Sequence, residues 1–424
     1  MYRILLVDDE ILVRDAIKEN IDWKSMDCQL VGDCENGKQA ADFVKSHPVD
    51  IVLTDILMPY MDGMELSHFL HDNYPEIVIV IFSGFGEFEY AKKAIQYNVS
   101  EYMLKPVTAM ELREVIGKMK EKVDVLVATY NGEKYIKEQL DSLLSQSHPY
   151  LLVDVCDDGS TDDTVSIVKE YEKKDSRVRL FENKTNQGYI RNFMSGIVRC
   201  DSPYIMLCDQ DDIWNWDKVE LTLEKMKLME RENPEKPVLV FTDAMNFDSS
   251  TGKKLGRFHE MSHLNVKKVD TAHLFMENKC IGCTIMMNRA ILPYLRELPE
   301  EIRMHDWWLA LICSHFGAIG YLPEATLMYR QHEGNQIGGT SYSGYLRKRI
   351  SKMKEQRQVL FDTYRQGKAF LRVFDSQMTK EQRKTATKFA TLADASFFGR
   401  RYLALRYGFL KSGLIRNAGL FFLL

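Results

Sequence analysis

The segment GKMKEKVDVLVATYNG, residues 117–132, constrains the fold of this chain more than any other. It starts as the charged end of a predicted helix and becomes an apolar β-type run at Val123, with no flexible linker between the two. VDVLVATYNG is also typical of the start of a domain rather than of its middle. The segment therefore predicts two folding units that meet near residue 122.

Length and composition agree with this division. A chain of 424 residues exceeds one ordinary domain, so two or three domains are expected. A net charge of -5 gives no reason to expect nucleic-acid binding. The chain contains eight cysteines, and it begins with a strand-like run rather than a signal peptide. Since no apolar run is long enough to span a bilayer, we expect a cytoplasmic protein with reduced thiols.

Short apolar runs alternate with helical spacing through the first 120 residues. The runs are RILLV (3–7), QLVGDC (29–34), DIVLT (50–54), IVIVIF (77–82) and EYML (101–104), and EFEYAKKAIQ (87–96) is a predicted helix. Five such runs with helical crossovers predict a parallel sheet with helices on both faces.

Polar residues stand where these strands end: Asp8, Asp9, Asp55, Ser83 and Lys105. Parallel strands share one carboxyl edge, so we expect these side chains in one crevice. Three carboxylates together favour a hard cation such as Mg²⁺, and a lysine and a hydroxyl suit a phosphoryl group. Each aspartate alone could equally be a helix cap or turn residue. The full set predicts phosphoryl transfer to the carboxylate of Asp55.

The motifs LLVDDE, TDILMPYMDG and YMLKP resemble the receiver domain of two-component response regulators, over residues 1–122. The resemblance implies a five-stranded flavodoxin-like fold, phosphorylation of Asp55 by a cognate histidine kinase, and a cis Lys105–Pro106 bond. It also implies Mg²⁺ held by Asp8, Asp9, Asp55 and the carbonyl of Leu57, and a switch made of Ser83, Tyr102 and Lys105. IDWKSM and SGFGEFEYAKKAI are most similar to receivers joined to AraC-type DNA-binding domains, but no helix-turn-helix pattern follows here.

A second alternating series begins at residue 123. VDVLVAT (123–129), LLVDVCDD (151–158), RVRLFEN (177–183) and YIMLCD (204–209) are predicted strands. Helices are expected from Glu133 and over 161–174, the latter capped by Thr161. This is a nucleotide-binding type of α/β layer without the GxGxxG of dinucleotide sites.

The stretch CDQDDIW (208–214) follows a buried strand. Asp209 and Asp211, two apart on an extended loop, can bind one divalent cation that also holds a diphosphate. The alternative is a solvated acidic loop that caps the next helix.

Two later stretches add candidate residues. In MHDWWLALICSHFG (304–317), Asp306 could cap a helix or act as a general base in a cleft walled by Trp307 and Trp308. In LMYRQHEGNQIGG (327–339), Arg330 and His332 suit a leaving diphosphate or its metal, and the glycines suit a lid. A plain surface loop is the alternative there.

The ordered set VATYNGE, DDGSTDDT, NQGYIRNF, CDQDDIW, HDWW and YRQH resembles the family 2 glycosyltransferases with a GT-A (Rossmann-like) fold, in particular the bacterial rhamnosyltransferase-like group, over residues 123–340. The resemblance implies an inverting transferase with Asp306 as base and Mg²⁺ or Mn²⁺ as cofactor. It implies the following ligands: Thr129, Tyr130, Glu133, Asp158, Asp209 and Arg330 for the nucleotide sugar, and Asp209, Asp211 and His332 for the metal. The QxxRW motif of processive members is absent.

Residues 341–424 combine helical patterns with basic and bulky apolar residues, as in RRYLALRYGFLKSGLIRNAGLFFLL (400–424). One interpretation is a helical extension packed on the catalytic domain. The other is a basic amphipathic surface that rests on the inner face of an anionic membrane, which would suit a lipid-linked acceptor.

These features favour a glycosyltransferase that moves a sugar, such as the deoxyhexose rhamnose, from a nucleotide-sugar donor to a cell-envelope or capsular polysaccharide acceptor, joined to a phospho-accepting receiver. Two alternatives stay open. The transferase-like half could be an effector or binding module of a two-component signalling protein, or the two halves could be fused without functional coupling.

Overall fold

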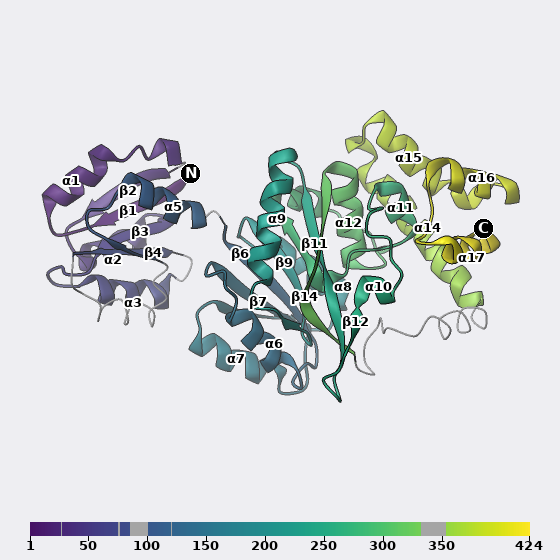
Figure 1. Cartoon of the computed structure of the whole chain (residues 1–424). Coiled ribbons are helices and arrows are strands. Elements are labelled where there is room, and N and C mark those ends of the chain that lie inside the picture. Colours follow the sequence, from purple (N-terminus) through teal and green to yellow (C-terminus); the bar gives the residue numbers. More distant parts are fainter. Residues whose placement is uncertain (27, 75–76, 85–100, 120, 332–352) are drawn as a thin grey trace. The chain divides into compact units, whose positions relative to one another are not determined.

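The computed structural model describes residues 1–26, 28–74, 77–84, 101–119, 121–331 and 353–424, drawn as ribbon in Figure 1. The chain forms two compact units. One consists of Met1–Lys122 with Glu172–Arg177, and the other of Val123–Tyr171 with Val178–Leu424.

The first unit contains a five-stranded parallel sheet in the order β2-β1-β3-β4-β5. Its strands are β1 (Tyr2–Val7), β2 (Cys28–Cys34), β3 (Ile51–Asp55), β4 (Val78–Ser83) and β5 (Glu101–Leu104), and its helices are α1 (Ile11–Asn20), α2 (Gly37–Ser46), α3 (Gly63–Asn73) and α5 (Ala109–Met119). This is the flavodoxin-like order, so the predicted fold is confirmed. The helix predicted over 87–96 lies outside the described residues.

The strands of this unit are nearly continuous apolar runs because both faces of the sheet are covered. Ile51, Val52 and Leu53 of β3 are all buried. The turn after β3 is equally fixed: a Cβ on Gly63 would lie 2.0 Å from the carbonyl oxygen of Asp55. Glycine therefore lets the start of α3 approach the end of β3.

The second unit is built on a larger mixed sheet in the order β10-β14-β11-β13-β9-β6-β7-β8, with β12 paired to β11 (Figure 1). Its strands are β6 (Val123–Thr129), β7 (Leu151–Asp157), β8 (Val178–Glu182), β9 (Tyr204–Asp209), β10 (Ile213–Trp214), β11 (Val238–Asp248), β12 (Lys254–Arg257), β13 (Ile285–Asn288) and β14 (Ala318–Gln331). Strands β8, β7, β6 and β9 are parallel. The chain reverses its direction of travel across the sheet between β6 and β9, which is where α/β sheets place ligands.

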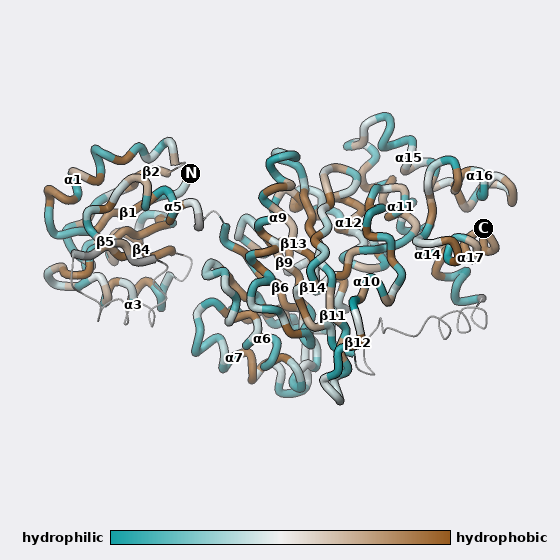
Figure 2. The backbone as a smooth tube through the Cα atoms, viewed as in Figure 1, coloured by the Kyte–Doolittle hydropathy of each residue, from teal (hydrophilic) through white to brown (hydrophobic). Residues whose placement is uncertain are grey.

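Helices cover this sheet, and Figure 2 shows the hydrophobic colouring concentrated on the strands between them. They are α6 (Ile136–Leu144), α7 (Thr164–Lys174), α8 (Tyr189–Arg199), α9 (Lys218–Glu232), α10 (Phe258–Met261), α11 (Thr271–Met276) and α12 (His305–Phe316). Two predicted starts were too early. The first helix begins at Ile136 rather than Glu133. The second begins at Thr164, and Thr161 does not cap it: Asp162 accepts the Thr164 N–H at 3.1 Å, while the Thr161 N–H donates to Asn131.

Four further helices complete the second unit: α14 (Met353–Phe374), α15 (Lys380–Ala390), α16 (Phe397–Tyr407) and α17 (Leu414–Leu423). They pack on the sheet-bearing part through aromatic contacts such as Phe275 with Phe370, whose ring centroids lie 5.5 Å apart. Arg303 donates from its backbone to Gln366 at 2.9 Å and from its side chain to Thr363 at 2.7 Å. The C-terminal region is therefore a helical extension of the α/β unit.

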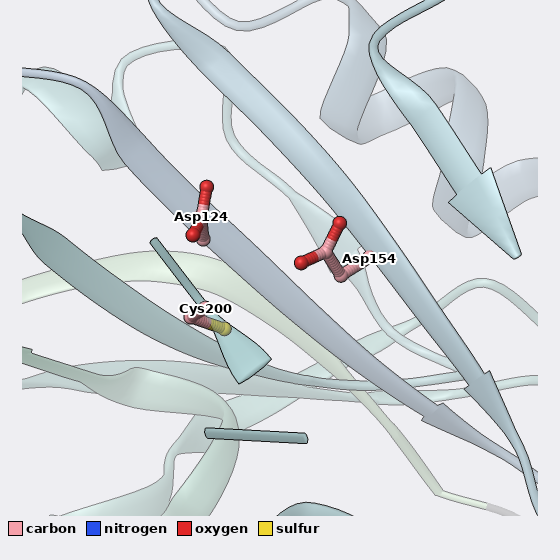
Figure 3. A group of neighbouring side chains, drawn as sticks. All are labelled: Asp124, Asp154 and Cys200. Carbon is pink, nitrogen blue, oxygen red and sulfur yellow. The ribbon is translucent and has the colours of Figure 1, made fainter. Parts of the chain in front are cut away.

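A buried polar cluster lies near the start of β6, at the opposite end of that strand from Thr129. Figure 3 shows Asp124 and Asp154 on neighbouring strands with Cys200 beside them. Asp124 accepts hydrogen bonds from the backbone N–H groups of residues 201 and 202, at 2.7 and 2.9 Å. Asp154 binds the Arg179 guanidinium through both oxygens, at 2.6 and 2.8 Å. Since each carboxylate has its partners within the protein, the cluster has a structural role in joining the strands to the loop after α8.

Candidate functional sites

The first site is the carboxyl edge of the five-stranded sheet. Asp8 follows β1, Asp55 ends β3 and Lys105 follows β5. The Lys105 Nζ atom lies 2.7 Å from Asp55 Oδ2 and 2.9 Å from Asp8 Oδ2. The structure thus brings together side chains that are up to 97 residues apart in the chain, as the strand-end argument predicts.

This edge also gathers carboxylate oxygens. Asp8, Asp9 and Asp55 each offer one oxygen, and these atoms lie within 4.8 Å of one another. Burial raises the pKa of Asp55, and the nearby Lys105 ammonium opposes that effect. A cluster of hard oxygen donors fits a divalent cation such as Mg²⁺. Leu57, whose carbonyl is the predicted fourth ligand, has an exposed side chain two residues beyond Asp55.

The remaining predicted receiver residues are placed by the backbone. Ser83 ends β4 and Tyr102 lies in β5; their side chains are outside what the structure describes. The bond between Lys105 and Pro106 is cis, as the resemblance implies.

The second site is a cavity of about 550 Å³ in the larger unit, at the carboxyl ends of β6, β7 and β9. Six predicted site residues line it: Thr129, Tyr130, Asp158, Asp209, Asp211 and Asp306. They come from four segments that are far apart in sequence. The cavity lies at the point where the strand order reverses, as expected for a ligand site in such a sheet.

Asp306 is in the first turn of α12, and the capping position is occupied by Met304 without a side-chain hydrogen bond. Asp306 is only 4% exposed, and burial raises its pKa to about 7. Its Oδ1 accepts the backbone N–H of Trp307 at 2.6 Å. A Cβ on Gly282 would lie 3.8 Å from the Asp306 Cβ and 2.9 Å from His305 Nε2. The glycine therefore keeps space open beside the carboxylate.

The prediction that Trp307 and Trp308 wall this cavity is wrong. Both indoles are buried in the hydrophobic core of the second unit. The Trp307 indole N–H donates to the carbonyl of Leu274, and Trp308 packs edge-on against Phe370 at 5.4 Å. Because α12 is apolar around most of its circumference, its tryptophans are taken up by the core, and Met304 and His305 line the cavity instead.

The loop after β9 holds the loop after β6. The Gln210 Oε1 atom accepts hydrogen bonds from Thr129 Oγ1 at 2.7 Å and from the Tyr130 N–H at 2.9 Å. The Gln210 amide nitrogen donates back to the Tyr130 carbonyl at 3.3 Å. We call these three contacts the Gln210 clamp. They tie the two sides of the cavity mouth together.

The acidic residues of this loop divide into two groups. Asp209 and Asp211 line the cavity, and burial together with the charges of Asp211 and Asp306 raises the pKa of Asp209. Asp212 lies behind them, 1% exposed, with one oxygen that has no hydrogen-bond partner among the described residues. Ligand atoms of Asp209, Asp212 and Cys283 lie within 4.8 Å of one another. The loop is thus no solvated acidic turn, and its carboxylates fit a divalent cation.

Asp158 organises one wall of the cavity. Its carboxylate accepts from the Asn183 amide at 3.0 Å and from the backbone N–H groups of Gln187 and Gly188 at 2.9 and 2.8 Å. Three donors on a 2% exposed carboxylate fix the loop that leads into α8.

Arg330 and Glu133 are not among the residues that line the cavity. Arg330 Nε donates to the Asp211 carbonyl at 2.7 Å, and its guanidinium lies 4.6 Å from the centroid of the Tyr135 ring. Glu133 accepts the Asp163 N–H at 3.0 Å. Both side chains therefore support cavity loops in this structure, and direct contact with a donor stays a prediction. His332 lies outside the described residues.

Several residues of the site were not predicted. Gln210 stands within the CDQDDIW stretch, where an amide between carboxylates could have indicated a side chain that hydrogen-bonds to a neighbouring loop. His305 and Cys283 carry no such signal: His305 lines the cavity from the start of α12, and Cys283 is buried beside Asp209 and Asp212. His305 stacks on Phe193 with ring centroids 4.0 Å apart.

A second cavity of about 270 Å³ adjoins the first and shares Gly188 and Tyr189 with it. Its other wall is the segment from Leu298 to Ile302. Tyr189 therefore lines both cavities, and its ring meets the His305 ring edge-on at 6.1 Å.

Comparison with protein families matches the two units separately. Residues 4–117 match the response regulator receiver domain, and residues 124–291 match glycosyl transferase family 2. The chain thus contains a receiver domain followed by a family 2 glycosyltransferase domain of GT-A type with a helical C-terminus.

Individual relatives cover one unit or the other. The uncharacterized transcriptional regulatory protein YesN of Bacillus subtilis is 40% identical over 124 residues, which are 28% of this chain and 34% of that protein. The chain therefore spans about a third of the length of that relative. The receiver domain of the response regulator AraT from Geobacillus stearothermophilus shows 36% identity and a TM-score of 0.27, covering 28% of this chain and 91% of that chain. Residues 1–349 of TarS from S. aureus, in complex with UDP, show 20% identity and a TM-score of 0.40. The match covers 68% of this chain and 92% of that chain.

Proposed function

In a chain that joins a receiver domain to a family 2 glycosyltransferase domain, we propose that the second domain transfers a sugar from a nucleotide-sugar donor to an acceptor hydroxyl, with inversion at the anomeric carbon. The observation that supports this most is that Asp306 shares one cavity with Asp209 and Asp211. A buried carboxyl with a raised pKa is suited to proton transfer.

The reaction is a single displacement. The acceptor O–H gives its proton to the Asp306 carboxylate while the acceptor oxygen forms a bond to the anomeric carbon. The bond between that carbon and the diphosphate oxygen breaks, and the nucleoside diphosphate leaves with the electron pair. Asp209 and Asp211, with Asp212 behind them, are the residues that would hold a Mg²⁺ or Mn²⁺ ion. When bound, that ion would supply positive charge against the diphosphate.

The larger cavity would bind the donor, and the adjoining smaller cavity would admit the acceptor. Thr129, Tyr130 and Asp158 line the part nearest β6 and β7 and would receive the nucleotide. The acceptor would enter past Tyr189 from the second cavity, because that side leads to Asp306. We propose a nucleotide-activated deoxyhexose such as dTDP-rhamnose as donor, and a glycan or lipid-linked glycan of the cell envelope as acceptor.

The receiver would accept a phosphoryl group on Asp55 from a histidine kinase. The proximity of Lys105 to Asp55 and Asp8 supports this, since an ammonium there can offset phosphoryl charge. We propose that 1–122 and 123–340 are the two functional domains and that 341–424 serves the second.

A thermal-shift screen of the full chain with nucleoside-diphosphate sugars, with and without Mg²⁺ or Mn²⁺, tests the donor assignment. One nucleotide sugar should raise the melting temperature in the presence of the ion and should then be hydrolysed slowly. If no nucleotide sugar shifts melting and none is hydrolysed, the transferase half is a binding or effector module. Turnover that does not change after treatment with acetyl phosphate identifies two uncoupled domains.

A further inference from the structure

Helix α17 is apolar on two sides: Leu420 is buried in the core, and a second apolar stripe faces solvent. Leu414, Ile415, Ala418, Gly419 and Phe422 are exposed, and the last four follow the i, i+3, i+4, i+7 spacing of one helix face. An ordinary surface helix carries polar and charged residues on its exposed side.

The polar residues of α17 are used for internal contacts. The Arg416 guanidinium donates to Glu277 at 2.6 Å, and Glu277 in turn accepts the Ser412 N–H at 2.6 Å. The Asn417 amide donates to the carbonyls of Lys411 and Gly413, each at 2.8 Å. These polar contacts, together with Leu420 in the core, fix the outward position of the apolar stripe.

Helix α16 repeats the pattern. Phe398, Tyr402 and Leu405 follow the i, i+4, i+7 spacing, and each is more than 60% exposed. Arg401 turns inward, where its guanidinium lies 3.5 Å from the centroid of the Phe397 ring and donates to the Phe421 carbonyl of α17 at 2.6 Å. The two helices are thus neighbours, each with an exposed apolar face. Both lie at the C-terminal end of the chain in Figure 1, and hydrophobic colouring covers much of α17 in Figure 2.

The charge of this segment identifies a partner. Residues 395–424 contain five arginines and lysines and no aspartate or glutamate, so they carry +5. The whole chain carries -5, so residues 1–394 carry -10. An anionic surface would attract this end of the chain and repel the rest, whereas a second copy would bring two positive faces together.

We infer that α16 and α17 form a docking face for an anionic phospholipid bilayer, with Phe398, Tyr402, Leu405, Ile415 and Phe422 entering the headgroup region and Arg406 beside them at the lipid surface. We call this set the α16–α17 face. Exposed aromatic and aliphatic side chains flanked by arginine are what interfacial helices use. No helix within the described part of the chain is long and apolar enough to cross a membrane, so the contact is peripheral. The inference stands apart from the proposed transfer reaction, because it uses none of the cavity residues.

Sedimentation of the full chain with vesicles tests it. The wild-type protein should bind vesicles of phosphatidylcholine with about 30% phosphatidylglycerol and bind pure phosphatidylcholine much more weakly. The variant Phe398→Ser/Leu405→Ser/Phe422→Ser should lose binding by about tenfold or more, since each change removes a large exposed apolar group that would enter the bilayer. Arg406→Gln should weaken binding to the anionic vesicles alone.

Leu228→Ser is the matched control. Leu228 is an exposed leucine on α9 of the same unit, and its replacement should leave vesicle binding unchanged. Circular dichroism and light scattering of each variant check that it folds and report its oligomeric state. The inference is overturned if the wild-type protein ignores anionic vesicles, if Leu228→Ser loses as much binding as the triple variant, or if the triple variant instead dissolves a dimer that never bound lipid.

Discussion

Gln210 Oε1 accepts a hydrogen bond of 2.7 Å from Thr129 Oγ1, which joins the acidic loop after β9 to the loop after β6. The same oxygen accepts the Tyr130 N–H. One amide thus sets the distance between the residues proposed to receive the nucleotide and those proposed to hold the metal.

The Gln210 clamp predicts a defect in donor binding. Gln210→Met keeps the length of the side chain but removes the acceptor for both hydrogen bonds, each worth about 1 kcal/mol. The dissociation constant of the donor should rise about tenfold, which calorimetry with the donor found by the thermal-shift screen would measure. Thr129→Val is the control: it removes one bond and keeps the Tyr130 contact, so its effect should be smaller. Equal donor affinity in Gln210→Met and wild type would contradict the clamp.

Asp306→Asn should separate catalysis from stability. The amide cannot accept the acceptor proton, so kcat should fall by about 10²–10⁴-fold. Donor affinity should stay within a few-fold. Because burial already raises the pKa of Asp306 to about 7, a neutral isostere costs the fold little, and the melting temperature should hold or rise. Steady-state kinetics and calorimetry measure both. Full transfer activity in Asp306→Asn would remove it from the role of base.

Arg330 offers a choice between two roles. The hydrogen bond from Arg330 to the Asp211 carbonyl indicates that Arg330 supports the acidic loop. In that case Arg330→Lys should lower the free energy of unfolding by about 1–3 kcal/mol, because a lysine ammonium cannot hydrogen-bond to all the partners of the guanidinium. Urea unfolding would show this in the absence of any donor. A variant with normal stability and reduced diphosphate affinity would instead support direct contact with the leaving group.

The receiver site was predictable from sequence because each of its residues directly follows a strand of a parallel sheet. The carboxyl ends of parallel strands lie at one edge of the sheet regardless of how the helices pack. Asp8, Asp55 and Lys105 therefore lie close together, as expected. Asp209 ends β9 in the same way, whereas Asp306 stands in the first turn of α12, and both line the cavity. Trp307 and Trp308 were misplaced because the sequence alone does not tell which face of an apolar helix meets the core. Cys283 could not be found, since a thiol in an apolar stretch has no local signal and reaches the acidic loop only through sheet packing.

The receiver makes a separate prediction. Treatment of the full chain with acetyl phosphate and Mg²⁺ should add one phosphoryl group, and Asp55→Asn should abolish it. The reason is that an amide offers no nucleophilic carboxylate oxygen. Electrophoresis that retards phosphorylated protein measures the modification. Asp33→Asn, a change at a carboxylate of β2 that pairs with Arg14 and Lys18, serves as control and should still be labelled. Labelling that survives in Asp55→Asn would place the acceptor elsewhere.

His315 predicts how the second unit responds to acid. It is 6% exposed, its Nε2 has no hydrogen-bond partner among the described residues, and burial lowers its pKa to about 4. The unfolded chain binds this proton near pH 6.5, so the stability contribution is present above pH 6.5 and is lost as pH falls toward 4. The full effect of a shift of this size is about 3 kcal/mol.

His315→Phe should therefore flatten the loss of stability between pH 6.5 and 4 by up to about 1.4 kcal/mol per pH unit. Urea unfolding at several pH values, followed by tryptophan fluorescence, measures the slope, and four of the five tryptophans (Trp214, Trp216, Trp307 and Trp308) belong to this unit. A constant offset from repacking against Phe370, 5.3 Å away between ring centroids, does not alter the slope. His47→Phe, at an exposed histidine of the receiver, should leave it unchanged. Identical slopes in wild type and His315→Phe would mean that His315 binds its proton as readily in the folded protein as in the unfolded chain.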